Sequence, residues 1–426
     1  MSRSKPTRDT AIDLVRALCV VCVVVLHSLM VGVTLTPDGP LFANAGESGW
    51  WLIPVSWVLQ VMPLFFVIGG FAGYTAYRRM QDRGRSGTDF VVGRIHRLLL
   101  PAAAVVGTAG IGLTLLGIAG VPGDLIAIAG YRFGQPLWFL AVFLLCQALL
   151  PALARAHRAA PFRTILGLAG SAVAVDVLRA SSGIEALGFL NLAFVWLTMQ
   201  QLGFFLAEGR IDALSRRTRL IVGGGALALL AIAFVTGVYS PDLIANINPP
   251  TAALILVGIV HTSAFSLLRA PIAAFASGRR AAAFTAFVSE RAMTIYLWHM
   301  TVLLVLAGGS AFLASASLLS LPDPASAAWW LGRPLWLALA LGITALISVP
   351  LARIEALRPP IGRVPAGRAA AAAIIGTASV AMLLIAGTST ATAAFAVAMM
   401  LGALLLATPS STAPLAAPRP ALLGAA

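Results

Sequence analysis

Three ionisable residues lie within the first long apolar stretch of the chain, namely Asp13, Arg16 and His27. A helical residue advances by about 100° and about 1.5 Å, so the three side chains share one face, and His27 lies roughly 16 Å from Arg16. Ionisable groups inside a membrane are costly and mark candidate functional sites. Asp13 and Arg16 are spaced for an ion pair, whereas His27 has no partner in its own segment; the alternative for His27 is a core histidine bonded to a carbonyl.

A second histidine, His299, ends the motif Tyr296-Leu-Trp-His299 in a later apolar stretch. It lies near the middle of that stretch, and Glu290 and Arg291 precede it near the start. A histidine at this depth is again a candidate functional residue. His261 and Asp176 are weaker candidates of the same kind.

The densest basic segment runs from Arg78 to Arg97, and we expect it to form a loop that ends where Pro101 opens the next span. Arg94 and Arg97 are three residues apart and can face the same way. Paired guanidinium groups suit phosphate ligands. A basic loop that only orients the protein in the membrane is the alternative, and the charge pattern alone favours it.

These residues require long apolar elements to position them. The chain has 426 residues, of which 59% are hydrophobic and 10% charged, and the mean hydropathy is +0.93. Soluble domains carry about 25% charged residues, and a β-barrel would show alternating polarity, so we expect an all-α polytopic membrane protein. Twelve spans are predicted, at 11–31, 50–77, 98–119, 137–154, 164–178, 186–207, 220–238, 251–268, 284–307, 328–350, 369–387 and 391–407.

The basic residues support these spans and predict their orientation. Of the 29 basic residues, 24 fall in alternate loops or at the ends of the chain, and only Arg132, Arg179 and Arg333 fall in the opposite loops. Positive loops remain cytoplasmic, so we expect both termini inside. The net charge of +14 is then explained by topology, and no nucleic-acid partner is expected. Lys5 is the only lysine, which indicates a GC-rich bacterial genome and hence a bacterial cytoplasmic membrane.

The spans divide the chain into five predicted parts. They are a cytoplasmic N-terminal segment (1–10), a transmembrane domain (11–350), a basic cytoplasmic linker (351–368), two additional helices (369–407) and a disordered cytoplasmic tail (408–426). Cys19 and Cys22 form a CxxC motif inside the first span, but no clustered ligands accompany it. We expect small buried hydrophobic side chains there, and no metal site.

Five motifs in order resemble the membrane acyltransferase 3 family. That family has an arginine and a histidine separated by ten residues in its first span, as Arg16 and His27 are here. Its second-span motif Phe-Phe-x-x-Ser-Gly-Phe is matched by residues 65–71, with Gly69 in place of the serine. The family's Arg-x-x-Arg before Leu-Pro corresponds to Arg94 and Arg97. The motifs Leu-Trp-Phe-Leu at 137–140 and Tyr-Leu-x-His at 296–299 also correspond, and the resemblance covers roughly residues 8–350.

The resemblance implies a ten-helix bundle, here with two further helices, that transfers an acyl group, often acetyl, from cytoplasmic acyl-CoA to a hydroxyl. Acceptors are carbohydrates of the cell envelope, lipid-linked glycans or small molecules. In this reading His27 takes the hydroxyl proton, a role that suits histidine near neutral pH. Arg16 and Asp13 organise the site, and His299 is a second catalytic candidate. Arg94 and Arg97 bind the phosphates of the donor.

Two other functions fit the same composition. A transporter or lipid flippase would also carry polar groups on its inward helix faces, although no inverted repeat is evident. A non-catalytic member of the family is the other alternative, and the glycine at position 69 keeps it open.

Overall fold

The computed structural model describes residues 9–37, 39–46, 49, 51–357 and 362–409. Parts of three predicted segments, 1–10, 351–368 and 408–426, lie outside these described residues. The elements in chain order are α1 (Thr10–Met30), β1 (Val31–Thr36), β2 (Gly39–Asn44), α2 (Leu52–Leu59), α3 (Met62–Gln81), α4 (Gly87–Ile118), α5 (Gly123–Gly134), η1 (Gln135–Leu137), α6 (Trp138–Ala159), α7 (Pro161–Ser182), η2 (Glu185–Leu190), α8 (Asn191–Ala207), α9 (Arg216–Val235), α10 (Ala253–Ala276), α11 (Arg279–Glu290), α12 (Ala292–Ser315), α13 (Ala327–Glu355), α14 (Ala366–Ala386) and α15 (Thr390–Leu406).

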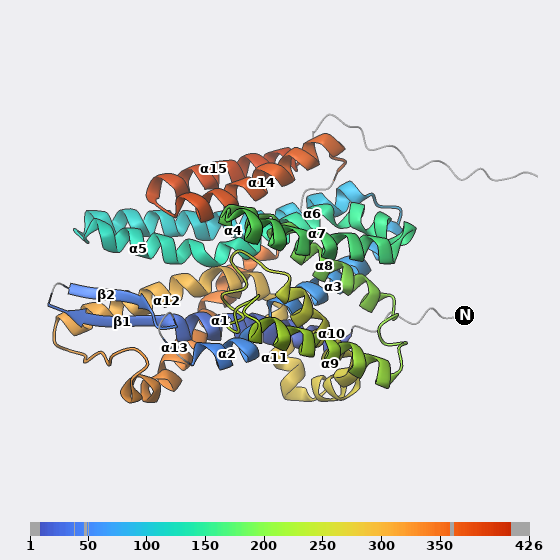
Figure 1. Cartoon of the computed structure of the whole chain (residues 1–426). Helices are drawn as coiled ribbons and strands as arrows, with labels where there is room; N and C mark the ends of the chain where they lie inside the picture. Colours follow the sequence, from blue (N-terminus) through green and yellow to red (C-terminus); the bar gives the residue numbers. More distant parts are fainter. Residues whose placement is uncertain (1–8, 38, 47–48, 50, 358–361, 410–426) are drawn as a thin grey trace, which may run out of the picture.

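Long apolar helices dominate the structure, as predicted (Figure 1). Within the described residues, eleven helices are long and apolar enough to cross a membrane, and Thr390–Leu406 is a shorter apolar helix. Each of the twelve predicted spans overlaps at least one of these helices. The chain is therefore an all-α multi-pass membrane protein, apart from one small sheet.

That sheet is a hairpin that directly follows α1 and was not predicted from the sequence. Strands β1 and β2 pair antiparallel, from Val31 opposite Asn44 to Thr36 opposite Gly39. β-Branched residues are frequent in β1, which favours an extended backbone. In Figure 1 the hairpin continues from the end of α1, and it packs beside α12.

Two of the differences between predicted and observed boundaries affect the candidate site. Helix α4 begins at Gly87, because the Ser86 hydroxyl accepts from the Asp89 amide (3.1 Å) and the Asp89 carboxylate accepts from the Ser86 amide (2.9 Å). Arg94 and Arg97 therefore lie on a helix rather than in a loop. The predicted span 284–307 is interrupted at Arg291, where α11 ends and α12 begins.

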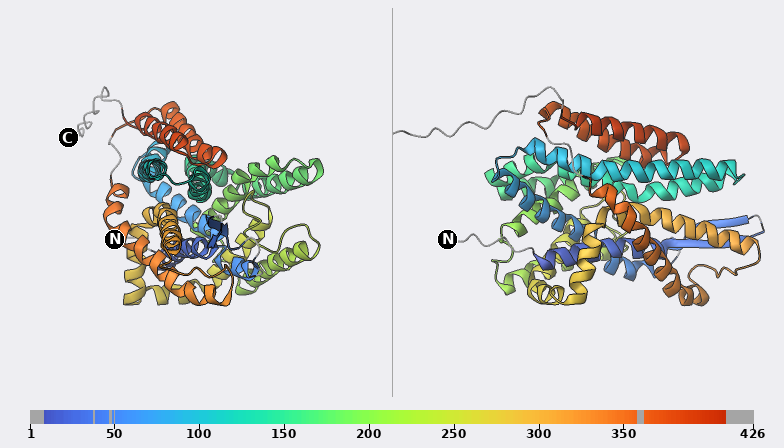
Figure 2. Two further views of the ribbon diagram at one scale, coloured as in Figure 1. Left: turned by 90° about the vertical axis from the view of Figure 1, so that its left-hand side faces the viewer. Right: turned by 180° about the vertical axis from the view of Figure 1, so that it is seen from behind.

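Helix α1 lies inside the bundle and contacts α3, α10, α11, α12 and α13. This packing satisfies the requirement that its polar face avoid lipid. Helices α14 and α15 pack against α4 and α6 at one edge of the bundle (Figure 2), and their buried residues belong to the same hydrophobic core.

Candidate functional site

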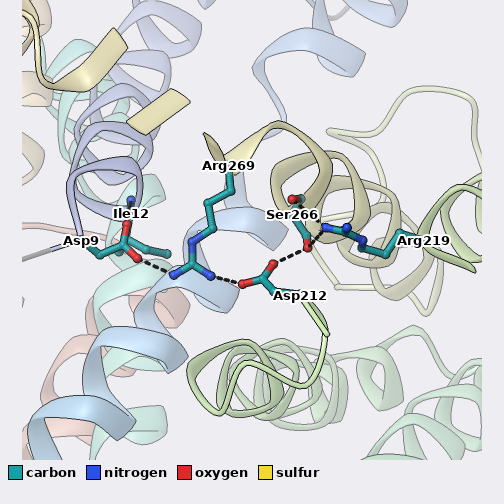
Figure 3. A network of polar contacts seen from close by, with 6 residues as sticks. All are labelled: Asp9, Ile12, Asp212, Arg219, Ser266 and Arg269. Carbon is teal, nitrogen blue, oxygen red and sulfur yellow. Dashed lines mark hydrogen bonds and ion pairs between the residues drawn. The ribbon is translucent and has the colours of Figure 1, made fainter. Parts of the chain in front are cut away.

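Helix α1 carries three of the predicted site residues and is held at both ends. At its start, Asp9 accepts a hydrogen bond from the Ile12 amide (3.1 Å) and forms an ion pair with Arg269 of α10. Figure 3 shows Arg269 between Asp9 and Asp212, so the start of α1 is tied to the segment after α8. One turn further, Arg16 donates to the buried Asp13 carboxylate at 3.3 Å, as the spacing predicted.

The last turn of α1 is held by α13. The Nη1 of Arg333 donates to the carbonyls of Ser28 (3.5 Å) and Val31 (3.3 Å), and the Nε1 of Trp336 donates to the Ser28 carbonyl (3.1 Å). The last carbonyls of a helix have no partner within the helix, and a guanidinium is favourable at the negative end of the helix dipole. These contacts fix the turn that carries His27.

The structure brings His27 and His299 together although 272 residues separate them. The Nδ1 of His27 lies 2.8 Å from the Nε2 of His299, and the two rings are stacked with an angle of 11° between their planes. The Nδ1 of His299 makes a short hydrogen bond to the Tyr296 carbonyl. Tyr296 is itself held, because its hydroxyl donates to the Pro136 carbonyl.

When both rings are neutral, this arrangement assigns their tautomers. A carbonyl oxygen only accepts, so the proton of His299 is on Nδ1 and its Nε2 is an acceptor. The Nδ1–H of His27 must then donate to that Nε2, which leaves the lone pair of His27 on its own Nε2. His299 is fully buried, whereas His27 is only partly buried. His27 is therefore the ring whose Nε2 lone pair is not used in the contact between the histidines, and His299 orients it.

A cavity of about 130 Å³ lies between α1, α3, α4, α6 and α12. Its wall is largely apolar and aromatic over one part, with Val20, Val23, Met62, Phe65, Phe139, Phe143 and Tyr296. The other part is polar, with Arg16, Arg94, Arg97, Gln147, Ser289 and Glu355. Val23 lies four residues before His27, and Tyr296 lies three before His299, so one helical turn separates the cavity wall from the histidine pair.

Three of the predicted site residues, Arg16, Arg94 and Arg97, therefore line one cavity. Arg97 is half exposed and lies 3.6 Å from the buried Glu355 carboxylate. Arg94 is partly buried; its guanidinium lies over the Phe90 ring (4.8 Å), and no carboxylate among the described residues pairs with it. Arg16 is paired with Asp13 and Arg97 with Glu355, so the three guanidinium groups leave one net positive charge, which makes this part of the cavity suited to anions.

Glu355 is a site residue that was missed, because the predicted domain ended at residue 350. The carboxylate accepts hydrogen bonds from the amide (3.1 Å) and hydroxyl (3.0 Å) of Thr294 at the start of α12. It thereby connects Arg97 to the helix that carries His299. An acidic residue at the end of a long apolar helix was the available sequence signal.

The other sequence candidates are not among the residues that line the cavity. Glu290 and Arg291 pair with each other at 3.2 Å. Asp176 is a structural residue: it accepts from Asn191 (2.8 Å), from the Ala252 amide (2.7 Å) and from the Tyr239 hydroxyl (2.7 Å). Burial and the Asp176 carboxylate raise the pKa of Tyr239, which keeps its hydroxyl protonated as a donor.

Comparison with known protein families agrees with the geometry. The family model Acyl_transf_3, described as an acyltransferase domain, matches residues 9–353, which is most of the chain. Comparisons with curated proteins and with solved structures gave no match. The matched range contains both histidines, the Asp13–Arg16 pair and both cavity arginines of α4. The chain therefore belongs to the acyltransferase 3 family of membrane proteins.

Proposed function

We propose that the protein transfers an acyl group from acyl-CoA to a hydroxyl group, with His27 as the general base. The observation that carries this proposal is the hydrogen-bonded chain from His27 to His299 to the Tyr296 carbonyl. A base that is oriented by a second group is the arrangement that activates a weak oxygen nucleophile. Membership of the acyltransferase 3 family supports acyl transfer in general. We further propose the donor, the acceptor and the role of each residue.

The chemical step balances without any further reactant. The acceptor oxygen attacks the thioester carbonyl carbon, and the hydroxyl proton moves to the Nε2 of His27. A C–O ester bond forms and the C–S bond breaks. The leaving thiolate takes the proton from His27, so the products are an ester and free CoA, and the base is regenerated.

The cavity supports an acyl-CoA donor of this kind. Arg94 and Arg97 would bind its phosphates at the polar end, and Arg16, held by Asp13, adds a third positive charge. The aromatic part then leads toward the histidines and is suited to an apolar acyl group. We propose a short acyl group such as acetyl, as the resemblance to the family implies.

The acceptor is proposed by class. We propose a carbohydrate, a lipid-linked glycan or a small molecule that carries a hydroxyl, used in a bacterial cytoplasmic membrane.

The test is turnover by the purified protein in lipid nanodiscs, with acetyl-CoA labelled in the acetyl group and a panel of hydroxyl acceptors. We expect label in the acceptor as an ester and one free CoA thiol for each ester formed. Proteoliposomes serve as the second arm of the experiment. Movement of intact acetyl-CoA or acceptor across the membrane, with no ester formed, would instead identify a transporter.

A further inference from the structure

Two buried polar side chains in the cavity wall lack a hydrogen-bond partner. Gln147 of α6 is 2% exposed and Ser289 of α11 is 7% exposed. Within the described residues, neither the Oε1 of Gln147 nor the Oγ of Ser289 has a hydrogen-bond partner, and both residues line the cavity. An unsatisfied buried polar group is destabilising, so such groups need an explanation.

Packing does not explain Gln147. It follows Phe143 by one turn of α6, and a leucine would fill a similar volume among its apolar neighbours. Gln200, a neighbouring buried glutamine whose Oε1 also lacks a partner among the described residues, still uses its amide nitrogen to donate to the Cys146 carbonyl at 3.1 Å. Gln147 makes no hydrogen bond of this kind within the described part of the chain, so its amide remains available to a ligand.

The position of Gln147 indicates which part of a ligand it would meet. Arg94 and Arg97 line the anion-binding end of the same cavity, and Phe139, two turns before Gln147 on α6, lines its aromatic part. A ligand that fills the cavity with its phosphates at the arginines would also contact the wall that contains Gln147. The segment that passes it needs groups that both donate and accept hydrogen bonds, because a glutamine amide offers both.

We propose that Gln147 and Ser289 bind the amide groups of the donor's linear arm, between its phosphates and its thioester. This inference rests on the proposed function, because it assumes that the donor is an acyl-CoA. The cavity would then recognise the donor by hydrogen bonds to its arm as well as by the positive charge of the arginines. A phosphorylated nucleotide without an amide arm could bind only to Arg94 and Arg97. CoA could bind to these arginines and also form hydrogen bonds with Gln147 and Ser289.

The test compares two probes that share a 3′,5′-phosphorylated adenosine. Adenosine 3′,5′-bisphosphate carries the 3′-phosphate and one of the two 5′-phosphates of CoA without the arm, and CoA carries all three phosphates and the arm. Binding of each is measured by titration calorimetry on the full-length protein in nanodiscs, for wild type, Gln147→Leu and Ser289→Ala. We expect the Kd for CoA to rise about tenfold in Gln147→Leu and by less in Ser289→Ala, since one hydrogen bond is lost in each case. The Kd for the bisphosphate should not change.

Two controls separate binding from folding. Gln81→Leu and Ser277→Ala make the same substitutions at exposed helix ends outside the cavity, where the side chains bond to Tyr77 and Ala274. They should leave CoA binding unchanged. The melting temperature of Gln147→Leu should equal or exceed that of wild type, because the variant removes an unsatisfied buried amide. A structural glutamine would give a lower melting temperature.

Several outcomes would overturn the inference. Unchanged CoA affinity in both cavity variants would do so, as would an equal loss of affinity for both probes. Equal affinities of wild type for CoA and the bisphosphate would show that the arm contributes nothing. If the wild-type protein binds neither probe, acyl-CoA is not the donor, and the proposed function is wrong as well as this inference. The other outcomes would contradict only the inference.

Discussion

Arg94 and Arg97 of α4 have different surroundings, although both belong to the same Arg-x-x-Arg motif. Arg97 is half exposed and already pairs with Glu355, whereas Arg94 is more buried and faces the cavity without a carboxylate partner in the described structure. A buried guanidinium that lacks an anion gains more from binding one, because it has less water to lose and no internal pair to break. Arg94 is therefore the stronger anion site.

The corresponding prediction concerns CoA binding. Arg94→Gln should weaken CoA binding by about tenfold or more, since a charged hydrogen bond contributes roughly 1.5–3 kcal/mol. Arg97→Gln should weaken it less, and Glu355→Gln should not weaken it, because that change removes a competing carboxylate. Arg85→Gln is the matched control, since Arg85 is exposed near Asp89 and lies outside the cavity. Unchanged binding in the double variant of Arg94 and Arg97 would exclude the proposed phosphate site.

For individual residues, the sequence predicted which ones are candidate functional residues but not which of them contact each other. Asp13, Arg16, His27 and His299 are conspicuous because ionisable groups are rare in apolar spans, and the Asp13–Arg16 pair follows from helical spacing alone. The contact between His27 and His299 depends on how α1 packs against α12, which one helix's periodicity does not determine. The contact of Glu355 with Arg97 was missed for the same reason.

The glycines of α3 show how close helix packing is achieved. A Cβ added at Gly70 would lie 2.2 Å from the Gln200 carbonyl oxygen of α8, and one at Gly203 would lie 2.1 Å from the Val67 carbonyl oxygen. The two helices therefore contact each other through their backbones, as small residues permit in membrane proteins. Gly69 differs: its added Cβ would lie 3.3 Å from a Phe143 ring atom, and it lines the cavity.

These distances predict opposite results for adjacent substitutions. Gly70→Ala should destabilise the protein by at least about 1–3 kcal/mol, because backbone cannot yield to a methyl group as a side chain can. Gly69→Ala should change stability by less than about 1 kcal/mol, since the Phe143 ring can shift slightly. Thermal unfolding in detergent, followed by tryptophan fluorescence, measures both. Equal melting temperatures for the two variants would contradict this account of the contact between α3 and α8.

Element boundaries were predictable only where hydrophobicity changes sharply. The long spans were found from their apolar runs. The start of α4 was missed because the Ser86–Asp89 capping box lies within a basic segment, and the break at Arg291 because apolar residues continue on both sides. The hairpin of β1 and β2 was missed because six-residue strands leave a weak pattern beside a transmembrane helix.

Over the whole molecule, the distribution of basic residues predicts the orientation in the membrane. The start of α1 and the hairpin that follows α1 lie at opposite ends of the bundle (Figure 1). Since basic loops remain cytoplasmic, the hairpin should be outside and the start of α1 inside. The cavity arginines would then lie toward the cytoplasm, where acyl-CoA is made, and the histidines further out.

Cysteine accessibility tests this orientation. In a background without Cys19, Cys22 and Cys146, Leu41→Cys lies on β2 and Leu214→Cys lies after α8; both positions are exposed. A membrane-impermeant maleimide added to intact cells should label the cysteine at position 41 and spare the one at position 214. Permeabilised cells should show both labelled. The reverse pattern would invert the topology and place the histidine pair on the cytoplasmic side.

The most direct test of the central claim is the kcat of His27→Ala with acetyl-CoA and a productive acceptor. We expect kcat to fall by about 10²–10⁴-fold, as loss of a general base does. The CoA affinity should not change, because Arg16 lies roughly 16 Å from His27 along α1 and His27 is not among the residues that line the cavity. His261→Ala, a histidine of α10 outside the cavity, should keep wild-type activity. A His27→Ala variant that retains wild-type kcat would contradict the account, because His27 would then not be the base.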